Sequence, residues 1–250
     1  MADSTPKTRT ALILLLALFV AGGAAALYVV NTSGGRPTGS LDQPTPNESE
    51  RLAAAAEAVL GGATKAEVIG ERAVITEAAR LLDTDFGPIL ITQSRAQDDC
   101  HACAGLTGVA YLGESEDGGF IVERRWADLV EGWGNGEPSE LAFDDRFTTN
   151  PAFLAKGSYT GQGVTASGFR IVELTPTGPM VSDLVRTGLD SSGLFGPDDP
   201  DRINLVGEAK EIDKDRGFII RVKGSEQFDE LYTIDGGRFV AVEKKSRLEL

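Results

Sequence analysis

The stretch Leu231–Val242, LYTIDGGRFVAV, sets the pattern of the fold. Two apolar runs flank the turn residues 235–237, Asp-Gly-Gly, which is the composition of a β-hairpin. Alternation along the two strands predicts two distinct faces. One face holds Tyr232, Ile234, Phe239 and Ala241, and the opposite face holds Thr233 and Arg238.

Three more stretches toward the N-terminus have the same form, two apolar runs joined by a cluster of turn residues. They are 109–122 with its turn at 116–119, 169–181 with its turn at 176–178, and 207–222 with its turn at 213–217. Residues 89–92, after Gly87-Pro88, predict a further buried strand. No motif repeats along these units, so the sequence predicts an antiparallel sheet or sandwich and not a propeller or solenoid.

Two helices are predicted before the strands. The first is 51–60, rich in Ala and Leu, capped by Ser49 and ended by the glycines 61–62. The second is 75–82, where apolar residues recur at helical spacing. These residues are Ile75, Ala78, Ala79 and Leu82. The predicted fold class is α+β, mainly β, with short helices before a hairpin-rich antiparallel sheet.

The segment Ala11–Val30, ALILLLALFVAGGAAALYVV, predicts an N-terminal transmembrane helix. At about 1.5 Å per residue it reaches about 30 Å, enough to cross the hydrocarbon core of a bilayer. Lys7 and Arg9 precede it, whereas acidic residues outnumber Arg36 in the stretch that follows, which places the N-terminus inside. The prediction is a single-pass protein with a cytoplasmic segment 1–10 and a periplasmic or extracellular bulk.

An alternative interpretation makes the same segment a cleaved signal peptide with an Ala-x-Ala site at Ala24 and Ala26. Both interpretations export the chain. Cleavage there would leave the apolar residues 27–30 as a new terminus, which favours the retained anchor. Residues 31–47, rich in Gly, Ser, Thr and Pro, predict a flexible linker, and 48–250 the extracytoplasmic mainly-β domain.

The net charge of −14 argues against nucleic acid as a partner, because a phosphate backbone repels an acidic protein. The expected partners are instead the bilayer, through residues 11–30, and a protein or other component of the envelope. The acidity most simply keeps an exported domain soluble.

The motif Cys100-His101-Ala102-Cys103 concentrates both cysteines and the single histidine of the chain. Covalent haem attachment requires a histidine directly after the second cysteine, where this chain has Ala104. A zinc site would need a fourth ligand from the adjacent residues 98–99, and four ligands so close in sequence are hard to fold around one ion. No cofactor is therefore expected.

Two interpretations of the cysteine pair stay open. A thiol-disulfide oxidoreductase would use Cys100 as attacking thiol, Cys103 as resolving thiol and His101 to lower the pKa of the first. Such a site needs a helix after the first cysteine, whereas the glycine-punctuated run 104–111 leads into a strand. A structural disulfide in an oxidising compartment is the favoured interpretation, and no catalytic residue is assigned.

Three short motifs together resemble a group of exported bacterial proteins of unassigned function. They are Cys100–Ala104, Gly132-Trp133-Gly134 and Tyr159–Gly163, and the resemblance covers roughly 86–239. It implies a mostly β extracytoplasmic domain with a paired Cys-x-x-Cys, and it assigns no catalytic residue.

Trp126, Trp133 and Tyr159 are the candidate binding residues, because aromatic side chains anchor interfaces and the last two lie in glycine-rich runs. A core position is the favoured interpretation of Trp126, which follows a predicted strand. The acidic loop residues Asp190, Asp198, Asp199 and Asp201 are a weak alternative as calcium ligands. Their spacing is not that of an EF-hand, and a solvated loop is favoured. The predicted function is that of a non-enzymatic, membrane-tethered binding or envelope-associated domain.

Overall fold

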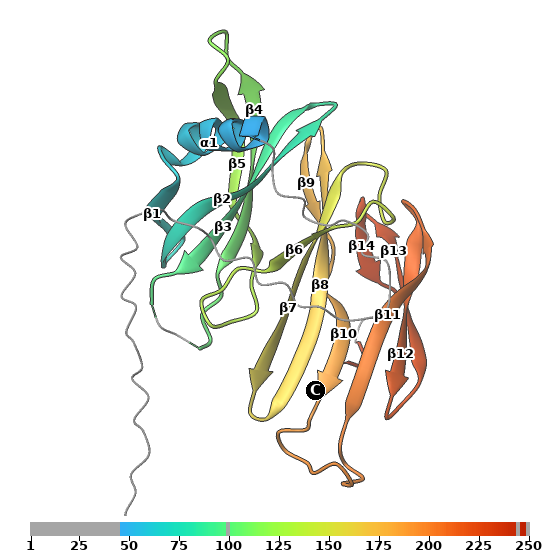
Figure 1. The fold of residues 1–250 in the computed structure, drawn as a ribbon. Helices are drawn as coiled ribbons and strands as arrows, with labels where there is room; N and C mark the ends of the chain where they lie inside the picture. Colours follow the sequence, from blue (N-terminus) through green and yellow to red (C-terminus); the bar gives the residue numbers. More distant parts are fainter. Residues whose placement is uncertain (1–45, 99–100, 244–245, 249–250) are drawn as a thin grey trace, which may run out of the picture. The chain divides into compact units, whose positions relative to one another are not determined.

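The computed structural model describes residues 46–98, 101–243 and 246–248 of the 250-residue chain. These ranges contain one α-helix and fourteen β-strands, and every strand pair among them is antiparallel (Figure 1). Both sheets belong to one compact unit, Pro37–Leu250. The prediction of a mainly-β, antiparallel fold is confirmed.

The first sheet is a meander of five strands in the order β1-β2-β3-β4-β5. Its strands are β1 (Thr64–Ile69), β2 (Arg72–Thr84), β3 (Gly87–Ala96), β4 (Leu106–Glu114) and β5 (Phe120–Glu131). The second sheet has nine strands in the order β14-β13-β12-β11-β10-β8-β7-β6, with β9 paired to β8 beside this path. Its strands are β6 (Glu140–Phe143), β7 (Ala152–Gly161), β8 (Val164–Thr175), β9 (Gly178–Val181), β10 (Val185–Asp190), β11 (Asn204–Asp213), β12 (Gly217–Gly224), β13 (Phe228–Asp235) and β14 (Arg238–Ala241).

Helix α1 (Pro46–Leu60) packs on one face of the first sheet (Figure 1). It ends where the sequence predicts, because Gly61 adopts a φ of +73° and its N–H donates to the Glu57 carbonyl at 2.9 Å. It begins three residues before the predicted cap Ser49, at a proline, whose fixed φ suits the first helical turn. Its buried side chains contact Leu90, Ala110 and Leu112 of the sheet.

The predicted helix at 75–82 is wrong, because these residues belong to strand β2. Val74 and Thr76 are fully buried between the exposed Ile75 and Glu77, which is the period of a strand. A bulge between Ala78 and Arg80 then shifts the alternation by one residue. Ala78 and Leu81 consequently face the same side, towards α1, and this spacing of three imitates a helix.

The four hairpins predicted from turn residues are confirmed as β4–β5, β8–β9, β11–β12 and β13–β14. In the last one, Tyr232 lies opposite Ala241 and Ile234 opposite Phe239, and all four belong to one core. Thr233 and Arg238 are exposed, as the alternation predicts. The sequence analysis did not identify the hairpins β1–β2, β2–β3, β7–β8 and β12–β13, which are also joined by short turns.

The described residues form three apolar clusters: one between α1 and the first sheet, one between the two sheets, and one on the other face of the second sheet. Ile89, Val109 and Tyr111 of the first sheet pack against Phe153, Val172 and Leu174 of the second. The other face of the second sheet carries the largest cluster, centred on Phe147, Phe218 and Tyr232. Phe218 stacks on Tyr232 with ring centroids 4.9 Å apart. The cluster that contains Ile89 and Phe153 is the one that holds the two sheets together.

The first sheet curls so that its edge strands β1 and β5 meet through side chains. Arg125 of β5 donates to Glu67 of β1 at 2.5 Å, and Arg72 of β2 pairs with Glu131 of β5 at 2.5 Å. Although burial alone would raise the pKa of Glu67, hydrogen bonds from Arg125 and Thr76 lower this pKa to about 2. These ion pairs fix the position of β5, whose C-terminal end lines the candidate site.

The predicted cytoplasmic segment 1–10, the transmembrane segment 11–30 and the linker 31–47 lie outside the described residues, except that 46–47 begin α1. Within the described ranges, no helix is both long and apolar enough to cross a membrane. The anchor therefore stays a prediction.

Candidate binding site

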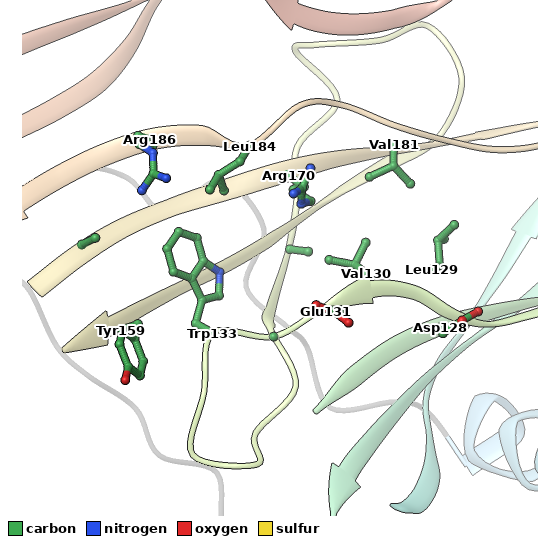
Figure 2. Close-up of a pocket in the computed structure, with 13 residues that line it drawn as sticks. Asp128, Leu129, Val130, Glu131, Trp133, Tyr159, Arg170, Val181, Leu184 and Arg186 are labelled. Carbon is green, nitrogen blue, oxygen red and sulfur yellow. The ribbon is translucent and has the colours of Figure 1, made fainter. Parts of the chain in front are cut away.

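A cavity of about 590 Å³ opens between the end of β5 and strands β7, β8 and β10 (Figure 2). We call it the Trp133 cavity. Its lining residues are Asp128, Leu129, Val130, Glu131, Gly132, Trp133, Ala155, Tyr159, Ala166, Arg170, Val181, Leu184 and Arg186. Its size is typical of ligand sites, which measure about 300–1,000 Å³.

The indole of Trp133 reaches from the loop after β5 to the second sheet, where it lies over two glycines. Gly157 of β7 and Gly168 of β8 are directly paired in register. A Cβ on Gly157 would lie 2.0 Å from the Trp133 Cδ1 atom, and one on Gly168 would lie 3.1 Å from its Cη2 atom. The absence of both side chains creates the slot that the indole occupies.

His101 joins the cysteine loop to two other segments that the sequence analysis identified. Its Nδ1 lies 2.6 Å from the Asn135 Oδ1 atom, and its Nε2 lies 3.2 Å from the Thr160 carbonyl oxygen. Its ring packs beside Tyr159 with centroids 5.2 Å apart. The three motifs that carry the resemblance to exported bacterial proteins therefore converge at one place, beside the Trp133 cavity.

Backbone hydrogen bonds reinforce this junction. The Asn135 N–H donates to the His101 carbonyl at 2.9 Å, and the Gly136 N–H donates to the Cys103 carbonyl at 2.8 Å. Asn135 adopts a φ of 56°, in the left-handed region that Asn tolerates better than most residues. At Gly134, with a φ of 132°, a Cβ would lie 2.7 Å from the Tyr159 ring, so the loop needs glycine there.

Arg170 is the most unusual charged group of the cavity. It is half-buried, and its Nη1 donates to the Ser182 carbonyl at 3.0 Å. Burial lowers its pKa below the ordinary value, and the charges of Asp183 and Glu131 oppose this only in part. Among the described residues, no carboxylate lies within ion-pair distance of its guanidinium.

The cavity combines charged groups with apolar ones. Arg170 and Arg186 project from strands β8 and β10 on one wall, while Asp128 and Glu131 lie on β5 (Figure 2). Glu131 already pairs with Arg72. None of the residues that line the cavity is a serine, cysteine or histidine. The cavity therefore presents guanidinium, carboxylate, aromatic and aliphatic groups.

Of the three aromatic candidates, Trp133 and Tyr159 line the same cavity, and Trp126 does not. Trp126 lies in β5 with its ring 5.3 Å from that of Tyr111, in an edge-to-face arrangement, and it packs on the core between the sheets. Arg124 covers it from the solvent side at 5.6 Å. This is the core position that the sequence analysis favoured.

Cys103 is disulfide-bonded. Cys100 lies outside the described residues, so the pairing of Cys100 with Cys103 stays a prediction. The segment after Cys103 leads into strand β4, and the one helix in the described part of the chain is α1. Cys103 therefore does not lead into a helix of the kind that activates thiols in exchange enzymes.

The acidic loop after β10 uses its carboxylates for local turns. Asp190 accepts the Ser192 N–H at 2.8 Å, and Asp199 accepts the Asp201 N–H at 2.9 Å. Across the described ranges, Asp198 included, no group of three or more His, Cys, Asp or Glu residues is arranged to hold a metal ion.

Sequence reasoning missed Arg170, Leu184 and Arg186. Arg170 carried one local signal, a cation among the otherwise apolar residues 169–172. The other two enter the cavity only because β10 pairs with β8, and this pairing skips β9.

Comparison of the chain with protein-family models, with curated proteins and with solved structures gives no match. The resemblance to exported bacterial proteins stays a prediction.

Proposed function

We propose that this chain is a membrane-tethered, extracytoplasmic binding domain that performs no catalysis, and that the Trp133 cavity is its binding site. In this proposal residues 11–30 anchor the chain, and 48–250 present the cavity to a ligand or to a component of the envelope. The domain would act by holding its partner close to the membrane.

One observation carries the proposal: the half-buried guanidinium of Arg170 lines a cavity beside aromatic and aliphatic groups. In the part of the chain that the structure describes, no carboxylate forms an ion pair with it. Ligand sites characteristically combine an apolar lining with a few polar groups that orient the ligand. The junction of His101, Asn135 and Thr160 supports the proposal further, because it holds the loop that carries Trp133 against the second sheet.

Thiol-disulfide exchange at Cys100 and Cys103, with His101 as the tuning group, has less support. Strand β4 follows the motif, and both ring nitrogens of His101 contact oxygen atoms of other segments. Measuring the reduction potential and insulin-reduction activity of residues 37–250 tests this alternative. We expect a potential well below those of exchange enzymes and no turnover, whereas catalysis would favour the oxidoreductase.

Photo-crosslinking in the cells that make the full chain tests the binding site. A benzoylphenylalanine at Leu184 lines the cavity, and one at Leu231, an exposed residue of β13, is the matched control. We expect a discrete adduct from position 184 and none from position 231. Equal adducts from both positions, or none from position 184, would contradict the proposal. The intact mass of the protein in membrane fractions separately decides whether the anchor is retained.

A further inference from the structure

Two arginines share one wall of the Trp133 cavity at a fixed spacing. Arg186 of β10 is paired in register with Gly168 of β8, and Arg170 lies two residues further along β8, so both belong to the same face of the sheet. Gly168 has no side chain, and a Cβ there would lie 3.1 Å from the Trp133 Cη2 atom, so the indole lies close to this part of the strand. A planar guanidinium pairs with a carboxylate or a phosphate through two parallel hydrogen bonds.

Most N–H donors of the Arg170 guanidinium form no hydrogen bond with the described residues. Only its Nη1 donates to a described residue, the Ser182 carbonyl at 3.0 Å, out of the five N–H groups that an arginine offers. Burial weakens the solvation of its charge and thereby lowers its pKa. An anion that pairs with Arg170 would therefore replace lost hydration with a direct contact.

Beside the charged residues Asp128, Glu131 and Arg186, the cavity that Arg170 lines has an apolar part. Alongside the indole of Trp133, the aliphatic lining residues are Leu129, Val130, Ala155, Ala166, Val181 and Leu184. Such a surface favours an apolar chain or ring over a highly hydrated ion such as free phosphate. A free inorganic anion would use the guanidinium and leave this surface in water.

We infer that the ligand of the Trp133 cavity is a small amphiphilic anion, in which Arg170 holds a carboxylate or phosphate group and the aliphatic residues hold its apolar chain. This inference rests on the proposed function, because it names the ligand class of the same site. The net charge of −14 would repel anions at long range. At physiological ionic strength this repulsion is screened beyond about 8 Å, so the local guanidinium decides.

Titration calorimetry tests the ligand class. The fragment 37–250 is suitable because it contains both sheets and all three apolar clusters. The probes are decanoate, decyl phosphate and decyltrimethylammonium, which share a chain and differ in headgroup. We expect saturable binding at one site for at least one of the two anions and none for the cation. The preferred anion identifies the headgroup.

Arg170→Met removes the guanidinium and keeps an unbranched apolar side chain similar to the aliphatic stem of arginine. We expect the affinity for the anion to fall about tenfold to hundredfold, the range for a charge-assisted hydrogen bond. Arg216→Met is the matched control, because Arg216 lies in the turn after β11, is largely exposed and pairs with Asp213. It should change the affinity less than twofold.

A second pair of variants keeps the test valid if Arg170→Met fails to fold. Leu184→Lys and Leu184→Glu place opposite charges of similar size on the same wall. We expect the lysine variant to bind the anion more tightly than the glutamate variant.

Three outcomes would overturn the ligand class: tighter binding of the cation, equal losses in Arg170→Met and Arg216→Met, or no difference between the two Leu184 variants. The crosslinking experiment at Leu184 is independent of these probes. If it gives a specific adduct while the anions fail to bind, the cavity is still the binding site and only its ligand class is wrong.

Discussion

Trp126 and Trp133 lie seven residues apart, yet the two ends of this segment do different things. Trp126 is inside β5 and packs against Tyr111, within the core between the sheets. Trp133 is in the loop beyond β5 and reaches a slot made by Gly157 and Gly168. The difference shows that the partner surface determines the role of each tryptophan: a packed core for the first, and a gap between two segments for the second.

The largest expected effect separates the two tryptophans by stability. Trp126→Ala removes a ring from the core and should lower the free energy of unfolding by about 3 kcal/mol. Trp133→Ala should cost about 1 kcal/mol, because its side chain is only half-buried beside an open cavity. Urea unfolding of residues 37–250 measures both. Equal losses would contradict the comparison.

The glycine slot can be filled. Gly157→Ala places a Cβ 2.0 Å from the present position of the Trp133 Cδ1 atom, so the indole must move, at a cost of about 1–3 kcal/mol. The control is Gly196→Ala, because nothing lies within 4 Å of a Cβ there. In a Trp133→Ala background the cost of Gly157→Ala should largely vanish, and an unchanged cost would mean that the slot serves something other than the indole.

The two ion pairs of β5, Arg125 with Glu67 and Glu131 with Arg72, differ in burial. Their contributions to stability should therefore respond differently to acid. Glu67, beside Arg125, has a side chain that is 12% exposed, whereas the Glu131 side chain that pairs with Arg72 is 62% exposed. Since hydrogen bonding lowers the pKa of Glu67 to about 2, its contribution is complete above the ordinary value of about 4.3 and is lost as the pH falls towards 2.

Glu67→Gln should therefore cost about 1–2 kcal/mol at pH 7, and the difference from the native chain should shrink between pH 4.5 and pH 2. Glu131→Gln should cost less than about 0.5 kcal/mol at any pH, as exposed pairs do. Urea unfolding at several pH values measures both. A Glu67 difference that stays constant in acid would show that the ion pair is not its source.

Local sequence patterns predict four of the hairpins. The full lining of the Trp133 cavity could not be predicted, because it depends on pairings between strands that are distant in the sequence. In Leu231–Val242 the turn glycines and the alternating residues lie within twelve positions, so the sequence alone predicts both strands and their faces. In β2 the bulge after Ala78 changed the alternation, and the sequence reads as a helix. A bulge depends on the partner strand, which no local pattern contains.

The aromatic members of the cavity could be predicted, because glycine-rich runs around Trp133 and Tyr159 are unusual by themselves. Arg170 could not be assigned, since a single arginine in a strand gains meaning only when its neighbours are known. The slot for the indole depends on the register that pairs Gly157 with Gly168. The wall that carries Arg170 and Arg186 depends on the pairing of β10 with β8. The first pairing lies within the β7–β8 hairpin, which the sequence analysis did not identify. The second is a consequence of strand order, which is not a property of any single segment.

The smallest effect on stability concerns His101, which is exposed and fixes the Trp133 loop from outside. Removing its contacts with Asn135 and Thr160 should cost less than about 1 kcal/mol, because exposed hydrogen bonds are largely replaced by water. The position of Trp133 should nevertheless change. In a Trp126→Phe background, Trp133 is the only tryptophan, so its fluorescence reports on the cavity alone.

We expect His101→Ala to make Trp133 more accessible to acrylamide and to shift its emission to longer wavelength. His101→Gln, which keeps a polar group able to reach Asn135, should restore part of the native spectrum. Thr233→Ala, at an exposed position of β13, is the control and should leave the emission unchanged. If His101→Ala also leaves the emission unchanged, then the glycine slot alone holds the indole, and the three motifs meet at this junction without positioning Trp133.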